Sequence, residues 1–357
     1  MEHLETADVY YELASVYEAQ GMYEKAIEVC WKSEAVRKKI LGENHPDIAS
    51  CYNCLAIIKM KQGEYYEAKK LFLRSLEILE STLGEKHPKT AGGYNNLASL
   101  YEKQGRYKEA ENLHRKAIQI NEEVLGKNHP DTATSYNNLA LLYDKMGKDE
   151  KAAPLFEKAL DISIKVLGKN HPDTATSYNN LASIYEKQGK TETAERLYKT
   201  AMGIVEKTLG ENHPQAASVY NNLAGLYSAK GEYEKAERLY KKALLIIENT
   251  LGYNHPLIAV KYNNLASLYE KLKKYNEAEE LYKKSIHIYE EVLGENHPDT
   301  LTSYTNLAGL YNDTGRMEEA EAIYKKAICV YREILGDNHS VVKYLEKILN
   351  DLSEEKK

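Results

Sequence analysis

The stretch VLGKNHPDTATSYNNLA occurs twice without a single difference, at residues 124–140 and again at residues 166–182. Its Leu-Gly pair recurs along the whole chain at a constant step of 42 residues. The occurrences are Leu41/Gly42, Leu83/Gly84, Leu125/Gly126, Leu167/Gly168, Leu209/Gly210, Leu251/Gly252, Leu293/Gly294 and Leu335/Gly336. A constant period of this length is typical of solenoids, whose units bury their apolar faces only by stacking on their neighbours. The repetition therefore predicts one elongated array.

Within one unit, large and small apolar residues follow helical spacing twice in succession. Tyr136, Leu139, Ala140 and Tyr143 recur at i, i+3, i+4 and i+7, which predicts a first helix, here called helix A. The same periodicity resumes after Gly147, which predicts a second, antiparallel helix, here called helix B. Each unit is therefore expected to be a helical hairpin.

The turn between helix A and helix B carries a recurrent glycine. It stands at Gly21, Gly63, Gly105, Gly147, Gly189, Gly231 and Gly315. The seventh repeat has Lys273 instead, and a left-handed backbone costs a non-glycine residue roughly 1 kcal/mol, so Lys273 is expected to adopt that conformation under strain. Gly168 is expected to close helix B as a left-handed cap, and Pro172 to open the next helix A.

These residues resemble the signature of the tetratricopeptide repeat. The motif LGxxHPD followed by NNLA and the long helix B resemble the 42-residue variant of kinesin light chains and their bacterial relatives. The resemblance implies an all-α fold, a right-handed superhelical solenoid of antiparallel helix pairs with helix A on the concave side. Tyrosine at the first large position, where the animal proteins usually have leucine, favours a prokaryotic relative or a consensus-like version.

The period also predicts the organisation of the chain. The eight repeats are expected at approximately 4–42, 43–84, 85–126, 127–168, 169–210, 211–252, 253–294 and 295–336. Residues 337–352 are expected to form a helix that caps the last repeat, and residues 353–357 a disordered tail.

Composition restricts the class of partner and the compartment. Charged residues make up 29% of the chain with a net charge of -6, and both signs are interspersed, which favours neither nucleic acid nor an anionic membrane. No apolar run approaches the ~20 residues needed to span a bilayer, and the N-terminus lacks a signal-peptide pattern, so a cytoplasmic location is expected. Four cysteines make no disulfide framework, and the single CxxC of Cys51 and Cys54 predicts a reduced structural pair.

The concave side of helix A is the candidate binding surface, and two rows of asparagines follow it. The first asparagine ladder is Asn53, Asn95, Asn137, Asn179, Asn221 and Asn263, and the second is Asn96, Asn138, Asn180, Asn222, Asn264 and Asn306. Asparagine is a mediocre helix former, and its amide can bind the backbone of an extended peptide whatever the peptide's side chains. The alternative is that one asparagine of each pair ties neighbouring repeats together through carbonyls of the adjacent helix.

Two further groups complete the candidate site. Lys103, Lys145 and Lys187 could bind acidic side chains of a ligand, or be solvated lysines beside acidic neighbours. Four apolar residues of the first two repeats, where later repeats have mostly polar ones, indicate either a terminal cap or an apolar docking site. They are Trp31, Leu73, Ile57 and Met60.

The sequence contains no pattern that indicates a catalytic or metal-binding site. One histidine recurs in every repeat, at His45, His87, His129, His171, His213, His255, His297 and His339. Two ligands of one zinc lie within about 4 Å of each other, whereas these positions are a whole repeat apart, so they are expected to be structural. No nucleophile elbow, phosphate loop or dinucleotide turn is present, so neither an enzyme nor a metal or other cofactor is predicted.

The sequence therefore predicts a non-enzymatic scaffold that binds an extended peptide or a partner protein. A second hypothesis is the recognition arm of a larger signalling protein, with its effector elsewhere. A third is an engineered, consensus-like array without a natural ligand. None of these observations identifies the ligand or the oligomeric state.

Overall fold

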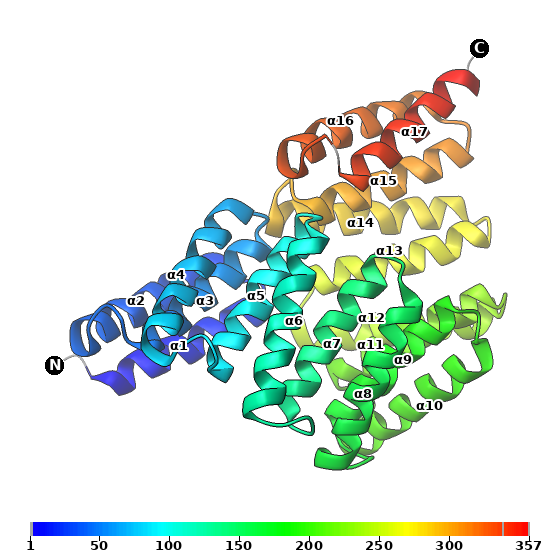
Figure 1. Cartoon of the computed structure of the whole chain (residues 1–357). Coiled ribbons are helices and arrows are strands. Elements are labelled where there is room, and N and C mark those ends of the chain that lie inside the picture. Colours follow the sequence, from blue (N-terminus) through cyan, green and yellow to red (C-terminus); the bar gives the residue numbers. More distant parts are fainter. Residues whose placement is uncertain (1–2, 338, 356–357) are drawn as a thin grey trace. The chain divides into compact units, whose positions relative to one another are not determined.

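The computed structural model describes residues 3–337 and 339–355, and within them every regular element is an α-helix. The first helices of the successive pairs are α1 (Leu4–Ala19), α3 (Pro46–Lys61), α5 (Pro88–Lys103), α7 (Pro130–Lys145), α9 (Pro172–Lys187), α11 (Pro214–Ala229), α13 (Pro256–Lys271) and α15 (Pro298–Asp313). Their partners are α2 (Tyr23–Leu41), α4 (Tyr65–Leu83), α6 (Tyr107–Val124), α8 (Asp149–Leu167), α10 (Thr191–Thr208), α12 (Tyr233–Leu251), α14 (Tyr275–Leu293) and α16 (Met317–Leu335). A last helix, α17 (Ser340–Glu355), follows α16 (Figure 1).

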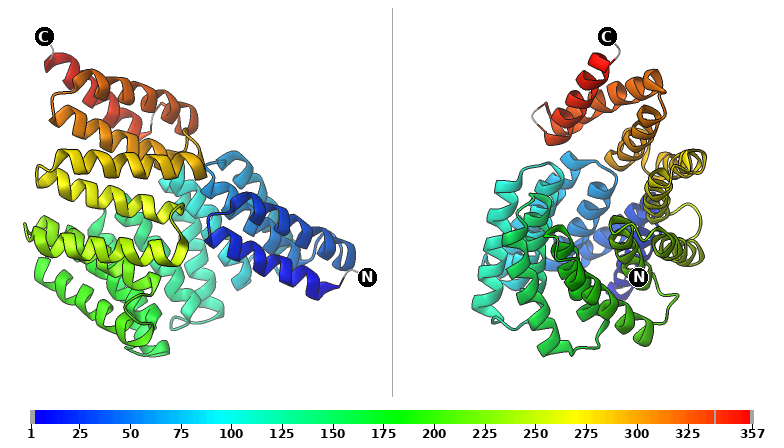
Figure 2. Two further views of the ribbon diagram at one scale, coloured as in Figure 1. Left: turned by 180° about the vertical axis from the view of Figure 1, so that it is seen from behind. Right: turned by 90° about the vertical axis from the view of Figure 1, so that its right-hand side faces the viewer.

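The chain divides into two compact units, residues 1–204 and 205–357, with the boundary inside α10. In the first unit each helix from α1 to α8 packs against the helix that follows it, and in the second each helix from α11 to α16 does the same. Figure 2 shows these hairpins side by side within each unit. The fold is therefore the all-α solenoid of antiparallel helix pairs that the repetition predicts.

The recurrent histidines begin the A helices. His171 Nδ1 accepts a hydrogen bond of 3.1 Å from the backbone N–H of Asp173, and the same bond recurs at the other seven positions. An imidazole nitrogen thus replaces the usual side-chain oxygen as the cap, and Pro172 occupies the first turn, where no N–H is needed. The expectation that these histidines are structural is confirmed.

The backbone at the two ends of helix B is partly as expected. Lys273 has φ of 59°, the left-handed conformation that the glycines adopt at the equivalent turns, and it is the one non-glycine residue with positive φ in the described chain. Gly168 has φ of 91° and ψ of 161°. The expectation of positive φ is confirmed, but ψ is extended, so this cap is not a left-handed helical one. Glycine is still required, because other residues avoid this region.

The tyrosines at the first large position connect consecutive repeats. Tyr94 Oη donates to Glu80 Oε1 at 2.5 Å, and the bond recurs at equivalent pairs such as Tyr262 and Glu248, at 2.9 Å. Tyrosine therefore buries an aromatic ring and places a hydroxyl on a carboxylate of the preceding helix B. A leucine at this position would provide only the apolar contact.

The C-terminal helix covers the last repeat. Val342, Leu345 and Leu352 are buried in a cluster with residues of α15 and α16, including Leu310 and Tyr324. The helix begins at Ser340 and continues to Glu355, so the expected end at residue 352 falls inside it. Of the tail expected at 353–357, residues 356–357 lie outside the described residues.

Candidate interaction surface

The two asparagine ladders bind each other between repeats. Asn180 Nδ2 donates to Asn137 Oδ1 at 2.9 Å, which joins α9 to α7. The pairs Asn96 to Asn53 and Asn264 to Asn221 repeat this bond, each at 2.8 Å. The alternative of a structural tie therefore holds for these pairs, although the acceptor is a side-chain amide and not a backbone carbonyl.

A tied pair is still able to bind a ligand. In each pair the donor asparagine keeps its carbonyl oxygen and one N–H. The acceptors Asn53 and Asn137 keep their NH₂ groups, whereas Asn221 Nδ2 donates to Asn222 Oδ1 at 3.4 Å. Asn137, Asn180, Asn221 and Asn264 are half-buried, so part of each amide reaches the surface. The tie also fixes the rotamers, which lowers the entropy lost when a peptide binds. Peptide binding by the ladders remains a prediction.

The tie is absent between Asn95 and Asn138. Asn95 is buried, its Oδ1 lies 2.8 Å from His114 Nδ1, and its Nδ2 donates to Ser135 Oγ at 3.0 Å. With Asn95 so occupied, Asn138 of the next repeat is half-buried and has no hydrogen-bond partner among the described residues. Sequence reasoning missed His114, although a histidine where the later repeats have phenylalanine or tyrosine was a visible signal.

Other ladder residues have different environments. Asn263 Nδ2 donates to Ser303 Oγ at 2.6 Å, as Asn95 does to Ser135, and its Oδ1 is buried without a partner in the described chain. Asn179 is buried and Asn222 half-buried, and each has a further interaction. The ladders are therefore not uniform, and Asn138 is their least satisfied member.

The lysine row is mostly paired with acids of the preceding repeat. Lys145 Nζ lies 2.7 Å from Glu102 Oε2, and Lys187 Nζ lies 2.5 Å from Asp144 Oδ1. Hydrogen bonds from His114 and Lys145 lower the pKa of Glu102 against the opposing effect of its burial, the largest single influence, so this carboxylate is held ionised. Those two lysines join consecutive repeats through ion pairs, whereas the sequence suggested either ligand-binding or merely solvated lysines; binding of an acidic ligand by them stays a prediction.

Lys103 differs from the rest of the row. It is exposed and has no ion pair within the described chain. The preceding repeat has Met60 where Glu102 and Asp144 stand in the later ones. An apolar residue has thus replaced the acid that would hold the Lys103 ammonium.

The apolar residues of the first two repeats lie in two places. Ile57 and Met60 are half-buried on α3. Trp31 on α2 is 44% exposed and Leu73 on α4 is 46% exposed, as expected for residues whose later counterparts are charged. The edge of Trp31 meets Tyr52, with ring centroids 6.3 Å apart. The expected exposure of Trp31 and Leu73 is confirmed, and the docking of a partner at this face stays a prediction.

A hollow of about 240 Å³ opens between α7, α8 and α9, the helices that contain most of the duplicated stretch. Ala133, Ile162 and Val166 provide its apolar lining. Asn137 and Ser177 provide polar atoms at its wall. The hollow therefore adjoins the first asparagine ladder and has room for one apolar side chain.

Two other classes of site were sought among residues 3–337 and 339–355. No group of three or more histidine, cysteine, aspartate and glutamate side chains there is arranged to hold a metal ion. In the same part of the chain, no helix combines the length and the apolar character that crossing a bilayer requires.

A model of the tetratricopeptide repeat family matches residues 5–58, 47–122, 90–165, 150–207, 173–249, 215–286 and 257–333. A solved structure of a Podosopora anserina putative kinesin light chain with nearly identical TPR-like repeats is 29% identical over 57% of this chain and 97% of that chain, with a TM-score of 0.46. BtubC (BKLC) from P. vanneervenii is 28% identical over 67% of this chain and 93% of that chain, with a TM-score of 0.49. The apo form of RapI shares the fold, at 17% identity over 80% of this chain and 98% of that chain, with a TM-score of 0.59. No curated protein sequence matches the chain.

Proposed function

This chain belongs to the tetratricopeptide repeat family, and from that premise we propose that it is a non-enzymatic scaffold that binds an extended peptide or an extended segment of a partner protein along its A helices. The observation that carries the proposal is that Asn138 has no hydrogen-bond partner, and Lys103 of the preceding repeat has no ion pair, among the described residues. Because the Asn138 amide is half-buried and engaged by no other residue, a peptide backbone can bind it without breaking a hydrogen bond of the fold. Asn138 and Lys103 are therefore available to bind a ligand.

The chemistry of this surface restricts the ligand. Lys103 favours a carboxylate, and the half-buried Met60 and Ile57 on the neighbouring α3 favour apolar atoms next to it. Helix α5 contacts both α3 and α7, so these residues and Asn138 lie on three neighbouring A helices. The proposed ligand thus contains an acidic residue flanked by an apolar one.

The hollow beside Asn137 accepts a second apolar side chain. Lys103 belongs to the last turn of α5, whereas Asn137 lies near the middle of α7. Eight residues of helical rise and one step between helices together give a separation on the order of 15 Å. An extended chain covers that distance in about five residues. The proposed ligand therefore has an acidic residue about five positions from an apolar one.

Binding of immobilised peptides to the full chain tests the proposal. An array of ten-residue peptides varies the spacing between one glutamate and one leucine, and tetratricopeptide arrays without an equivalent of Lys103 serve as a reference. Peptides with a spacing of four to six residues are expected to bind best. The double variant Asn138→Ala and Lys103→Ala is expected to bind them at least tenfold more weakly, the effect of about 1.4 kcal/mol.

Lys108→Ala is the matched control, because Lys108 is an exposed lysine on α6. It is expected to bind the peptides as the wild type does. Equal binding by the double variant, or binding that is independent of spacing and of the glutamate, would refute the assignment of this surface. The cytoplasmic location, a protein partner and the absence of a nucleic-acid or membrane partner are part of the same proposal.

A further inference from the structure

Three cysteines meet at the junction of the first two repeats. Cys30 comes from α2, Cys51 and Cys54 come from α3, and all three are buried and free of disulfides. The Cys30 thiol donates to the backbone carbonyl of Cys51 at 3.4 Å, and both other cysteines are near enough to influence its pKa. The CxxC motif is therefore not an isolated pair, and its third member was not recognised because it lies 21 residues upstream.

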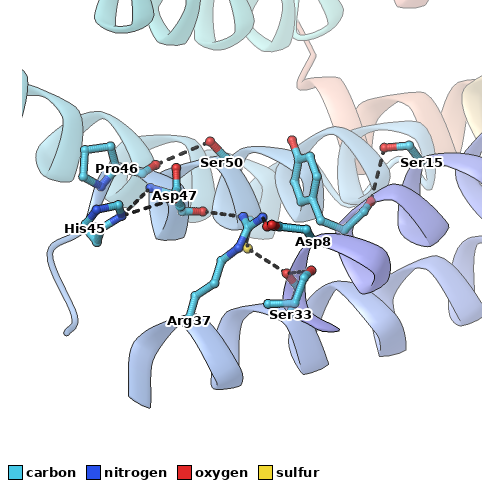
Figure 3. A network of polar contacts seen from close by, with 11 residues as sticks. Asp8, Ser15, Ser33, Arg37, His45, Pro46, Asp47 and Ser50 are labelled. Carbon is cyan, nitrogen blue, oxygen red and sulfur yellow. Dashed lines mark hydrogen bonds and ion pairs between the residues drawn. The ribbon is translucent and has the colours of Figure 1, made fainter. Parts of the chain in front are cut away.

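A buried guanidinium, that of Arg37, lies beside Cys51, and Figure 3 shows Arg37 together with Asp8, Ser33 and Asp47. Arg37 is 6% exposed, and its Nη1 lies 3.4 Å from Cys51 Sγ and 3.0 Å from the backbone oxygen of Asp47. Its Nη2 binds Asp8 Oδ1 at 2.8 Å. The Cys51 thiol lies 3.7 Å from Ser33 Oγ, which donates to a backbone carbonyl of α1. Cys51 therefore has a positive charge and a hydroxyl beside its sulfur.

These contacts make the cysteines unequal. The hydrogen bond from Cys30 is the largest influence on Cys51, and with Ser33 and Arg37 it lowers the pKa of the Cys51 thiol to about 7 against the effect of burial. Hydrogen bonding to Cys51 and Cys54, followed by burial, raises the pKa of the Cys30 thiol. At neutral pH a part of Cys51 is thus ionised, while Cys30 keeps its proton. Thiolates, and not thiols, attack peroxides and disulfides.

We propose that the Cys51–Cys30 pair is a peroxide-sensitive site, in which a hydroperoxide oxidises Cys51 and Cys30 then closes a disulfide between α2 and α3. The Cys51 sulfur attacks the peroxide O–O bond and becomes a sulfenic acid, while the other oxygen leaves as water or an alcohol. The Cys30 sulfur then attacks the sulfenic sulfur and displaces hydroxide, which leaves as water with the Cys30 proton. Two thiols and one hydrogen peroxide thus give one disulfide and two waters.

Oxidation of Cys51 favours the subsequent attack by Cys30. The Cys51 thiolate is one of the groups that raise the pKa of Cys30. Once Cys51 is a neutral sulfenic acid, that influence disappears and Cys30 ionises more easily. The product ties the first repeat to the second, because α2 and α3 belong to consecutive hairpins.

Two features of the cluster favour this chemistry over other roles. The described residues include no group of three or more ligands arranged for a metal ion, so a thiolate metal site is disfavoured. Cys54 is 9% exposed beside the fully buried Cys51, so the cluster reaches the surface through Cys54.

The test uses the full chain with Cys329→Ser, which removes the exposed cysteine. After treatment with hydrogen peroxide, free thiols are blocked under denaturing conditions and the disulfide-linked peptides are mapped by mass spectrometry. A link from Cys30 to Cys51 is expected. Cys30→Ser is expected to leave a sulfenic acid at Cys51 that dimedone traps, and Cys51→Ser to abolish both products.

Substitution of Arg37 distinguishes a reactive cysteine cluster from a merely structural one. Arg37→Gln is expected to slow oxidation of Cys51 about fivefold, because a rise of one unit in the pKa of Cys51 lowers its thiolate fraction at neutral pH by that factor, whereas Arg37→Lys retains most of the rate. Circular dichroism establishes that each variant is folded. Oxidation of Cys51 without linkage to Cys30, or a native cluster that stays reduced under peroxide that oxidises the denatured chain, would overturn the proposal.

Discussion

Asparagine at the two ladder positions has two different roles, depending on its neighbour. Asn180 ties α9 to α7 through Asn137, whereas Asn138 has no partner in the described chain. Asn180→Ala is therefore expected to lower the free energy of unfolding by about 1 kcal/mol, the net value of one hydrogen bond. Asn138→Ala is expected to leave it unchanged or slightly higher, because alanine is the better helix former.

Urea denaturation of the full-length single variants measures this difference, with hydrogen exchange locating it to α7 and α9. Equal losses for the two variants would show that Asn138 also stabilises the fold, and would remove the reason for placing a ligand there. Equal tolerance of both would show that the amide ties contribute nothing measurable.

Lys273 is the one residue of the described chain that adopts a glycine conformation with a side chain. Lys273→Gly removes the clash between its Cβ and the backbone, so the variant is expected to gain roughly 1 kcal/mol of stability. The gain should appear as slower hydrogen exchange in α13 and α14, which flank the turn. Gly231→Ala, with φ of 78° at the equivalent turn before α12, is the matched control and should destabilise its own hairpin. Unchanged exchange at α13 and α14 would show that the glycines serve another purpose.

Features that a residue determines within its own turn could be predicted from the sequence. Lys273 and the histidine caps belong to this class, because the repeat shows the same backbone requirement eight times. The contacts of His114, Cys30 and Arg37 could not be predicted, since each depends on which side chains meet between helices that are distant in sequence. The same holds for Met60. The sequence shows that it departs from the repeat, but not that its apolar side chain leaves Lys103 without an acidic partner.

At the scale of the helices, the C-terminal ends of the A helices form a row of acids and lysines in which the charge of the lysine position is reversed at α15. Asp313 ends α15 where Lys145 and Lys187 end α7 and α9. It faces Glu270 of α13, whose Oε2 accepts a hydrogen bond of 3.0 Å from Tyr282. Burial, and after it the nearby Asp313, raise the pKa of Glu270 above its ordinary value. Two carboxylates therefore oppose each other at negative helix ends.

Asp313→Lys is expected to restore the pairing and to stabilise the second unit at neutral pH by up to about 1 kcal/mol, the range of partly exposed ion pairs. Because the folded state raises the pKa of Glu270, its protonation favours folding below the unfolded pKa, and this contribution is lost as pH rises through the folded pKa. The advantage of the variant over the wild type should therefore be larger at pH 7 than at about pH 4.5. Thermal unfolding at both values tests this, with Asp313→Asn as the neutral control. An advantage that does not change with pH would show that Glu270 does not sense Asp313.

At the scale of the molecule, the repetition determines which contacts exist at all. Each helix packs mainly against the helices before and after it within its unit, so the stability of an array is a sum of local and nearest-neighbour contributions. The fold could be predicted from the period for this reason. The binding surface could be predicted only in outline, because it depends on the few places where one repeat fails to complete its neighbour, such as Lys103 and Asn138.

Removal of the C-terminal helix α17 tests whether the stability of the array is a sum of nearest-neighbour contributions. Val342, Leu345 and Leu352 of α17 are buried against α15 and α16, and each such side chain contributes about 1.5–3 kcal/mol when buried. Truncation of the chain after Gly336 should therefore accelerate hydrogen exchange strongly in α15 and α16 and weakly in α13 and α14. Exchange in α11 and α12 should not change, since these helices have no contact with α17. Leu345→Ala leaves the helix in place and removes one buried side chain, which costs about 2–5 kcal/mol or less. It should accelerate exchange in the same order of helices as the truncation, but to a smaller extent. Equal acceleration throughout residues 205–335 would instead mean that the second unit opens as one cooperative body, and nearest-neighbour packing would then not account for its stability.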